Sequence, residues 1–147
     1  NAPLSIPRPP EAEAGPRAYK LLIDGAFVDA ADGRTLERVA PGHGFAVSRY
    51  ALASSVDVEH AVSAAHTAFE TGPWPRMTAG ERAAILLRTA DLIDSRRDEI
   101  ARLDALESGK PIAQARGEIA GAADIWRSCA GISLSIATAA MPWSSSA

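Results

Sequence analysis

The sequence predicts a mixed fold in which helices dominate and short antiparallel hairpins precede them. Three observations carry this prediction. Residues 78–111 have apolar positions at helical spacing, with charged residues between them. Short strand-forming runs alternate with turn residues over residues 19–52. Aromatic residues are only 5% of the chain and alanine supplies much of its apolar content, which favours a small-residue helical core over a β-sandwich.

The beginning of the chain is rich in proline, which fixes φ and removes a backbone N–H donor. We therefore expect residues 1–18 to form a disordered lead-in that stays out of sheet ladders and helix interiors. A docking peptide is the alternative interpretation of this arm.

Short strand-like runs follow the arm. Residues 19–28 are predicted to form a β-hairpin around Asp24 and Gly25, a pair that tolerates positive φ. Residues 35–40 and 46–52 are predicted to form two more strands on either side of a Pro-Gly-containing turn. Together these runs favour an antiparallel meander or an addition to the edge of a larger sheet.

Two capping boxes mark helix starts. In Ser54 with Asp57, and in Thr78 with Glu81, the spacing lets each side chain satisfy a free backbone N–H. The first box predicts a helix over residues 55–71. Its apolar positions recur at helical spacing and are Val58, Ala61, Val62, Ala65 and Phe69.

The segment behind the second box is predicted to hold two helices rather than one. A break is expected near Asp94–Ser95, because Ser95 with Asp98 can cap a second helix. Gly109 is expected to end that helix in a left-handed conformation, and Pro111 resists its continuation. Another helix is expected to run from there to about residue 130.

Charge and composition argue against several classes of function. The net charge of −3, with mixed signs, gives no basic footprint for nucleic acid. No apolar run reaches the roughly 18 residues of a membrane helix. No apolar signal-peptide core is present at the start, so a cytoplasmic location is expected. A single cysteine cannot form an internal disulfide framework.

Few residues carry a recognisable chemical pattern. Cys129 has no adjacent group that would activate a thiolate, and we expect it to be a small buried hydrophobe. The histidines have no metal-ligand spacing, which favours surface or turn roles. Glu107 and Lys110 lie three residues apart at a helix end, where a local ion pair is the simplest interpretation.

Several blocks of sequence, taken in order, form a specific pattern. They are LLIDGAFVDA, VAPGHGFAVSRYALASSVDVEHAVSAAHTAF and GPWPRMTAGERAAILLRTADLIDSRRDEIARLDALESGKP. Each resembles a block in the N-terminal part of the NAD(P)-dependent aldehyde dehydrogenase superfamily. The resemblance covers about Tyr19 to Gly131.

The resemblance implies an α/β fold. Residues 19–131 would be the N-terminal part of a Rossmann-like NAD(P)-binding domain, mainly helices plus short antiparallel hairpins. The implied reaction is oxidation of an aldehyde to a carboxylic acid, with NAD or NADP as cofactor, a cysteine nucleophile and a glutamate that activates water. In the family these residues and the cofactor-binding ones lie downstream, so no catalytic or cofactor-binding residue is assigned here. The implied partners are a small-molecule aldehyde and, as a homo-oligomer, further copies of the enzyme.

The resemblance is expected to stop near residue 131. Residues 132–147 form a divergent tail, which is typical of a frameshift or truncation, and the isolated chain is expected to be inactive. Two alternatives remain open, a non-catalytic interaction module and a decayed product.

One site carries over from the family. Some members bind a monovalent cation through a carboxylate just before a Gly-Lys-Pro sequence and through backbone carbonyls near the end of the second hairpin. The matching positions are Glu107, Arg38 and Val39, and a further ligand would come from downstream. The resemblance therefore implies a monovalent cation site at these residues.

Overall fold

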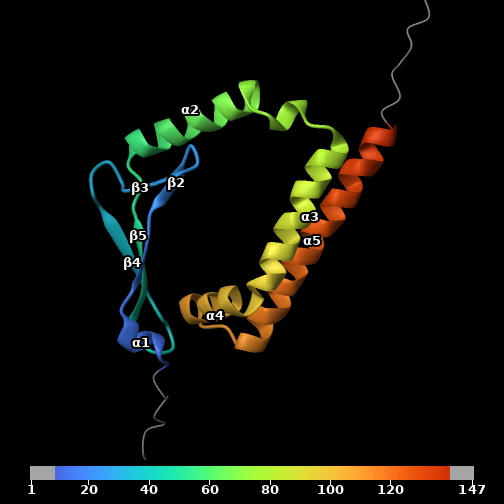
Figure 1. Ribbon diagram of the computed structural model, residues 1–147. Coiled ribbons are helices and arrows are strands. Elements are labelled where there is room, and N and C mark those ends of the chain that lie inside the picture. The colour runs from blue at the N-terminus through green and yellow to red at the C-terminus, as the bar shows by residue number, and fades with distance from the viewer. Residues whose placement is uncertain (1–8, 140–147) are drawn as a thin grey trace, which may run out of the picture. The chain divides into compact units, whose positions relative to one another are not determined.

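The computed structural model describes residues 9–139. Figure 1 shows that helices and short strands make up this part of the chain, which confirms the mixed fold. The helices are α1 (Glu11–Ala14), α2 (Ser55–Thr71), α3 (Ala79–Ser95), α4 (Arg97–Ser108) and α5 (Ile112–Ala139), with a 3₁₀ turn η1 (Trp74–Arg76). The strands are β1 (Arg17–Tyr19), β2 (Leu21–Ile23), β3 (Ala26–Val28), β4 (Thr35–Val39) and β5 (Ala46–Ala51).

These elements divide between two compact units. The first takes its described residues from 1–71 and 103–111, and the second from 72–102 and 112–147. All strands and α2 therefore belong to the first unit, and α3 and α5 belong to the second. Helix α4 begins in the second unit and ends in the first.

Strand β5 is the centre of the larger sheet in the first unit. It lies between β1, to which it is parallel, and β4, to which it is antiparallel. Strands β2 and β3 form a separate antiparallel pair. Of the two predicted arrangements, the antiparallel meander is therefore wrong, because β5 takes its second neighbour from the arm that precedes the hairpin.

The arm joins this sheet through its last residues. Arg17 is paired with Ser48 and Tyr19 with Tyr50, and Glu11–Ala14 form the short helix α1. The prediction of a disordered lead-in over residues 1–18 is therefore wrong for these described residues. Pro16 directly precedes the paired residues, so its missing N–H falls outside the ladder. The part of the arm before residue 9 lies outside the described residues.

The β2–β3 hairpin has the turn that the sequence predicts. Asp24 and Gly25 have φ values of 51° and 74°. Positive φ at both central residues is typical of the tight turn whose twist matches the paired strands. Ile23 and Ala26 are partners across it, so the register is set directly by the turn.

Helix α2 begins where the capping box predicts. The Ser54 N–H and hydroxyl donate to the Asp57 carboxylate at 2.8 and 2.7 Å, and the Asp57 N–H is 3.4 Å from the Ser54 hydroxyl oxygen. The apolar stripe of this helix is exposed within the first unit. Its largest members, Val58, Val62 and Phe69, are 52%, 63% and 71% exposed.

The second unit is built on the packing of α3 against α5, which lie side by side (Figure 1). Among its described residues, the buried apolar ones are all alanines: Ala83, Ala90, Ala101, Ala115, Ala123 and Ala130. Small side chains at the contact let two helices approach closely. The predicted small-residue helical core is therefore confirmed in this unit.

Helix α3 is capped as predicted and ends at the predicted break. Thr78 and Glu81 form the capping box, with both reciprocal hydrogen bonds present. The Ser95 hydroxyl, however, donates backward to the Leu92 carbonyl at 2.9 Å. The predicted capping role of Ser95 for α4 is therefore wrong, since its side chain closes the preceding helix instead.

Helix α5 is longer than predicted, because it continues past residue 130 to Ala139. The Ser128 and Ser135 hydroxyls donate to the carbonyls of Asp124 and Gly131, so these serines are accommodated within the helix. The rest of the predicted tail, from residue 140 onward, lies outside the described residues. No helix between residues 9 and 139 has an apolar stretch long enough to cross a bilayer.

Candidate functional site around Glu107

Glu107 lies in the last turn of α4, just before the glycine that ends the helix. Gly109 has φ 76° and its N–H donates to the Ala105 carbonyl at 2.9 Å, which confirms the predicted left-handed ending. A Cβ on Gly109 would come within 2.8 Å of the Pro41 side chain. The glycine therefore lets the end of α4 lie against the turn between β4 and β5.

The Glu107 carboxylate faces β5. Its Oε1 accepts hydrogen bonds from the Ser48 hydroxyl, at 2.5 Å, and from the Tyr50 hydroxyl. Ser48 and Tyr50 are two residues apart on one strand, so their side chains point to the same face of the sheet. Ser48 is fully buried, and Glu107 is half-buried. Among the described residues, no group donates a hydrogen bond to Oε2 of Glu107.

The local ion pair predicted between Glu107 and Lys110 is wrong. Lys110 Nζ lies 3.0 Å from Asp104 Oδ2, on the preceding turn of the chain. Glu107 instead reaches a serine 59 positions earlier in the sequence. The two β5 hydroxyls, one on buried Ser48 and one on half-buried Tyr50, donate to the carboxylate, and such charge-assisted hydrogen bonds are stronger than neutral ones.

Tyr50 is held on two sides. Its ring stacks on Tyr19 of β1, with centroids 5.2 Å apart and planes inclined by 16°. Burial raises the pKa of the Tyr50 phenol, and the hydrogen bond to the Glu107 carboxylate raises that pKa further. Tyr50 therefore remains a protonated hydrogen-bond donor at neutral pH.

The other two residues of the implied cation site lie on β4. Arg38 is the cross-strand partner of Ser48, and Val39 is the partner of Ala46. The register shifts between Arg38 and Val39, so the β4–β5 ladder is irregular beside the Glu107 cluster. The sheet thus places the backbone of Arg38 next to one of the two residues that bind Glu107.

Asp57 is a buried carboxylate in the first unit that accepts several hydrogen bonds. Besides its capping bonds with Ser54, it accepts the Ala31 N–H on both carboxylate oxygens at 3.1 Å. Hydrogen bonds from the Ser54 N–H and hydroxyl, and then from Ala31, hold the pKa of Asp57 below its usual value. Asp57 therefore ties the turn after the hairpin to the start of α2. The spacing predicts its capping role, but the link to Ala31 has no local sequence signal.

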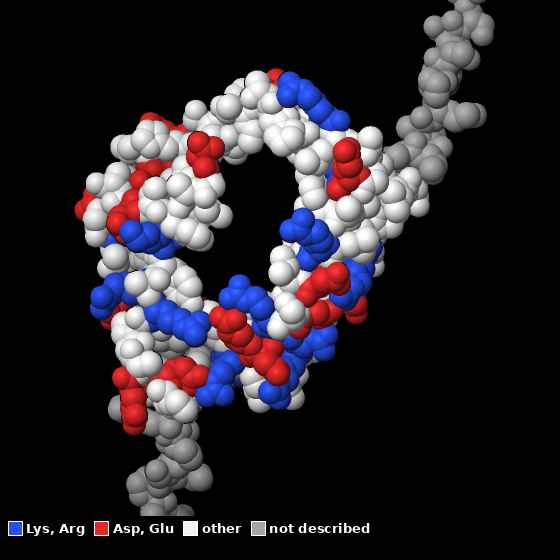
Figure 2. All heavy atoms as spheres, viewed as in Figure 1, with Lys and Arg blue, Asp and Glu red and all other residues white. Residues whose placement is uncertain are grey.

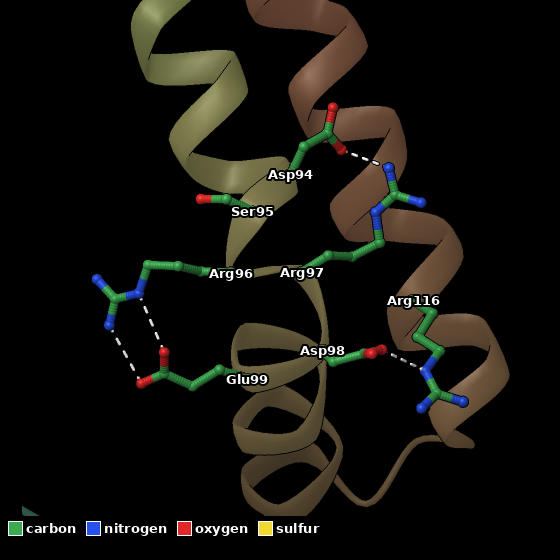
Figure 3. Close-up of a pocket in the computed structure, with 7 residues that line it drawn as sticks. All are labelled: Asp94, Ser95, Arg96, Arg97, Asp98, Glu99 and Arg116. Atoms are coloured by element: carbon green, nitrogen blue, oxygen red, sulfur yellow. Dashed lines mark hydrogen bonds and ion pairs between the residues drawn. The ribbon is translucent and has the colours of Figure 1, made fainter.

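A cluster of charged residues surrounds the break between α3 and α4 in the second unit (Figure 3). These residues line a depression of about 460 Å³ and are Asp94, Ser95, Arg96, Arg97, Asp98, Glu99 and Arg116. Figure 2 shows Lys and Arg interspersed with Asp and Glu around this break. The sequence places most of these charges at a solvated helix start, which fits their exposure.

The arginines of this depression are paired with carboxylates. Arg96 lies 3.0 Å from Glu99, and Arg116 lies 2.8 Å from Asp98. Asp94 accepts hydrogen bonds from Arg97 and Arg127, which lower its pKa. Because the positive charges are compensated, the depression offers an anionic ligand little net attraction.

A comparison with known families decides the identity of the fold. The family model described as "Aldehyde dehydrogenase family" matches residues 27–147. The chain belongs to the aldehyde dehydrogenase family. The match extends to residue 147, past the point near Gly131 where the resemblance is expected to stop.

Individual aldehyde dehydrogenases agree with this assignment. The mitochondrial benzaldehyde dehydrogenase of Antirrhinum majus is 48% identical over 95 residues, which are 65% of this chain and 18% of that protein. The crystal structure of an NAD-dependent aldehyde dehydrogenase from Sinorhizobium meliloti is 49% identical with a TM-score of 0.80, over 84% of this chain and 24% of that one. An NAD+ complex of the Bacillus cereus enzyme is 38% identical with a TM-score of 0.76, over 86% and 26%. The chain thus spans about a fifth of the length of such curated aldehyde dehydrogenases.

Cys129 departs from its expected setting in this aldehyde dehydrogenase chain. The thiol lies on α5 and is exposed, so the prediction of a buried cysteine is wrong.

Proposed function

We propose that this chain is the N-terminal part of an NAD(P)-dependent aldehyde dehydrogenase that oxidises an aldehyde to a carboxylic acid. The observation that carries the proposal is the family match over residues 27–147. The 49% identity to an NAD-dependent aldehyde dehydrogenase, and the NAD+ complex of a second relative, support a nicotinamide cofactor. Neither the fold nor the relatives favour the alternative of a non-catalytic interaction module.

The proposed reaction consumes an aldehyde, water and oxidised cofactor, and yields a carboxylic acid, reduced cofactor and a proton. The nicotinamide, when bound, accepts the hydride. No residue of this chain is assigned to bond making or to cofactor contact. Its contribution is structural, since Asp57 fixes the start of α2 and Glu107 joins the end of α4 to β5.

A cytoplasmic location and a homo-oligomeric assembly belong to the same proposal. Both mitochondrial and cytosolic proteins are among the relatives, so the cytoplasm is one of two compartments that their names include. Cell fractionation tests the location, and light scattering on the whole protein tests the assembly. A monomer at micromolar concentration would contradict the proposed oligomer.

The enzymatic proposal is tested by following reduced cofactor with the whole protein. Benzaldehyde and a short aliphatic aldehyde serve as probes, each with NAD+ and with NADP+. We expect a rise in absorbance of the reduced cofactor that requires both aldehyde and cofactor, and that a thiol-alkylating reagent abolishes. A folded protein that reduces neither cofactor with any aldehyde would contradict the proposal.

We further propose a monovalent cation site formed by Glu107 and the backbone carbonyls of Arg38 and Val39. Carboxylate and carbonyl oxygens are the ligands that hard cations take. Oε2 of Glu107 has no hydrogen-bond donor among the described residues, and the β4–β5 register brings the Arg38 backbone alongside Ser48, which binds Glu107. These two features support the proposed ion site.

Thermal unfolding of the whole protein tests this cation site. Potassium chloride is compared with choline chloride at equal ionic strength, for the parent and for Glu107→Ala. A ligand that binds only the folded state raises Tm, and the rise grows with the logarithm of ligand concentration above its Kd, so we expect a potassium-specific rise in the parent and its loss in the variant. A potassium effect that Glu107→Ala leaves unaltered would exclude the site.

A further inference from the structure

Two hydroxyl groups of β5 donate hydrogen bonds to the same carboxylate oxygen of Glu107. Ser48 and Tyr50 both donate to Oε1, and among the described residues nothing donates to Oε2. A carboxylate held through one oxygen has a defined side-chain orientation, and its second oxygen is left for another ligand. The difference between the two carboxylate oxygens is therefore set by Ser48 and Tyr50 as well as by Glu107.

We infer that Ser48 and Tyr50 are positioning residues, which orient Glu107 so that Oε2 is presented to a monovalent cation. This inference rests on the proposed cation site and names the residues that set its geometry. Neither hydroxyl contacts the cation in this account. Each acts through Glu107, as the hydrogen-bond partners of metal ligands generally do.

Both donors are held in place by the sheet. Ser48 lies on the central strand, paired with Arg17 of β1 on one side and with Arg38 of β4 on the other, and it is 0% exposed. Tyr50 is fixed by its stacking on Tyr19, with ring centroids 5.2 Å apart. Donors on a rigid strand orient a ligand more accurately than donors on a loop.

The register also connects the donors to the other ligands. Arg38, whose carbonyl belongs to the proposed site, is the direct cross-strand partner of Ser48. The irregularity at Val39 begins at the next residue. One pair of strands thus carries both the groups that orient the carboxylate and the carbonyls that would join it.

The test measures potassium affinity through Tm in the whole protein, with potassium chloride titrated against choline chloride at constant ionic strength. The variants are Tyr50→Phe and Ser48→Ala, which each remove one hydroxyl. Tyr19→Phe is the matched control, because it removes a hydroxyl from the stacked ring without removing a hydrogen bond to Glu107. Unfolding in potassium-free buffer shows whether each variant folds.

We expect Tyr50→Phe and Ser48→Ala to need at least about tenfold more potassium than the parent to reach the same Tm rise, because losing a hydrogen bond to a metal ligand usually weakens metal affinity by that factor. Tyr19→Phe should titrate like the parent. If the parent responds to potassium and both Tyr50→Phe and Ser48→Ala respond identically to it, the positioning role is overturned. The cation site itself then remains supported. A parent with no potassium response would overturn both.

Discussion

Asp57 shows how much one carboxylate can organise. It caps α2 through Ser54 and also binds the Ala31 N–H, so a helix start and a distant turn share one side chain. Its pKa is lowered because these hydrogen bonds favour the ionised form. Protonation of this group therefore weakens the folded state.

The pH dependence of stability tests the role of Asp57. A lowered pKa in the folded state means that its contribution is fully present above the ordinary Asp pKa of about 3.9 and is lost as the pH falls through the folded value. We expect Asp57→Asn to lower Tm by several degrees at neutral pH, and the difference to shrink below about pH 4. Asp29→Asn, which removes an exposed ion pair with Lys20, should change Tm little. A Tm difference for Asp57→Asn that is constant with pH would contradict this account.

Gly109 is the second residue with a sharp requirement. Its φ of 76° is strained for any residue with a Cβ, and that atom would meet Pro41 at 2.8 Å. We expect Gly109→Ala to lower the free energy of unfolding by at least about 1–2 kcal/mol in a denaturant titration. Gly121→Ala is the control, since open space surrounds Gly121 within α5 and alanine favours helices by up to about 1 kcal/mol. Equal stabilities of the two variants would rule out the close approach at Gly109.

At this scale, the sequence predicts what is local. The Asp57 cap and the Gly109 ending depend on neighbours within a few positions, and both are confirmed. The Ser48–Glu107 bond spans 59 positions, and no spacing rule reaches that far. Resemblance to a family singles out Glu107, but only the fold shows that β5 hydroxyls bind it.

Among the elements, features that depend on neighbouring residues are predicted from the sequence, and features that depend on distant residues are not. Capping boxes place the starts of α2 and α3 because both partners lie within one turn. The sequence predicts too early an end for α5, because serine and alanine give little amphipathic signal although they fit a helix. The parallel pairing of β1 with β5 could not be predicted, because β1 is a short strand that only its distant partner stabilises.

The alanine core of the second unit gives a prediction about helix packing. Ala83 of α3 is 3% exposed, whereas its neighbour Ala84 is exposed. We expect Ala83→Leu to lower the free energy of unfolding by about 1–3 kcal/mol, because a larger side chain forces helices that pack through alanines apart. Ala84→Leu should leave stability within about 0.5 kcal/mol of the parent. If both substitutions had the same small effect in a denaturant titration, the close packing of this face would be wrong.

For the whole molecule, the family assignment has to be considered together with the fact that no catalytic or cofactor-binding residue is assigned in this chain. The chain matches the aldehyde dehydrogenase family over residues 27–147 and spans about a fifth of its curated relatives. Among the described residues, the carboxylates of Asp57 and of Asp98 at the α3–α4 break are held by hydrogen bonds or ion pairs, and Glu107 is bound through Oε1. We propose that this chain contributes packing and the cation site, and that the cofactor contacts of the enzyme are made by other residues.

Calorimetric titration of NAD+ tests that account most directly, performed in parallel on the whole protein and on the 147-residue chain. Circular dichroism of the chain first establishes its helix content, so that a negative result refers to folded material. We predict saturable NAD+ binding by the whole protein and no binding heat from the chain. Binding by the chain with the affinity of the whole protein would place the cofactor site within these residues and contradict the account.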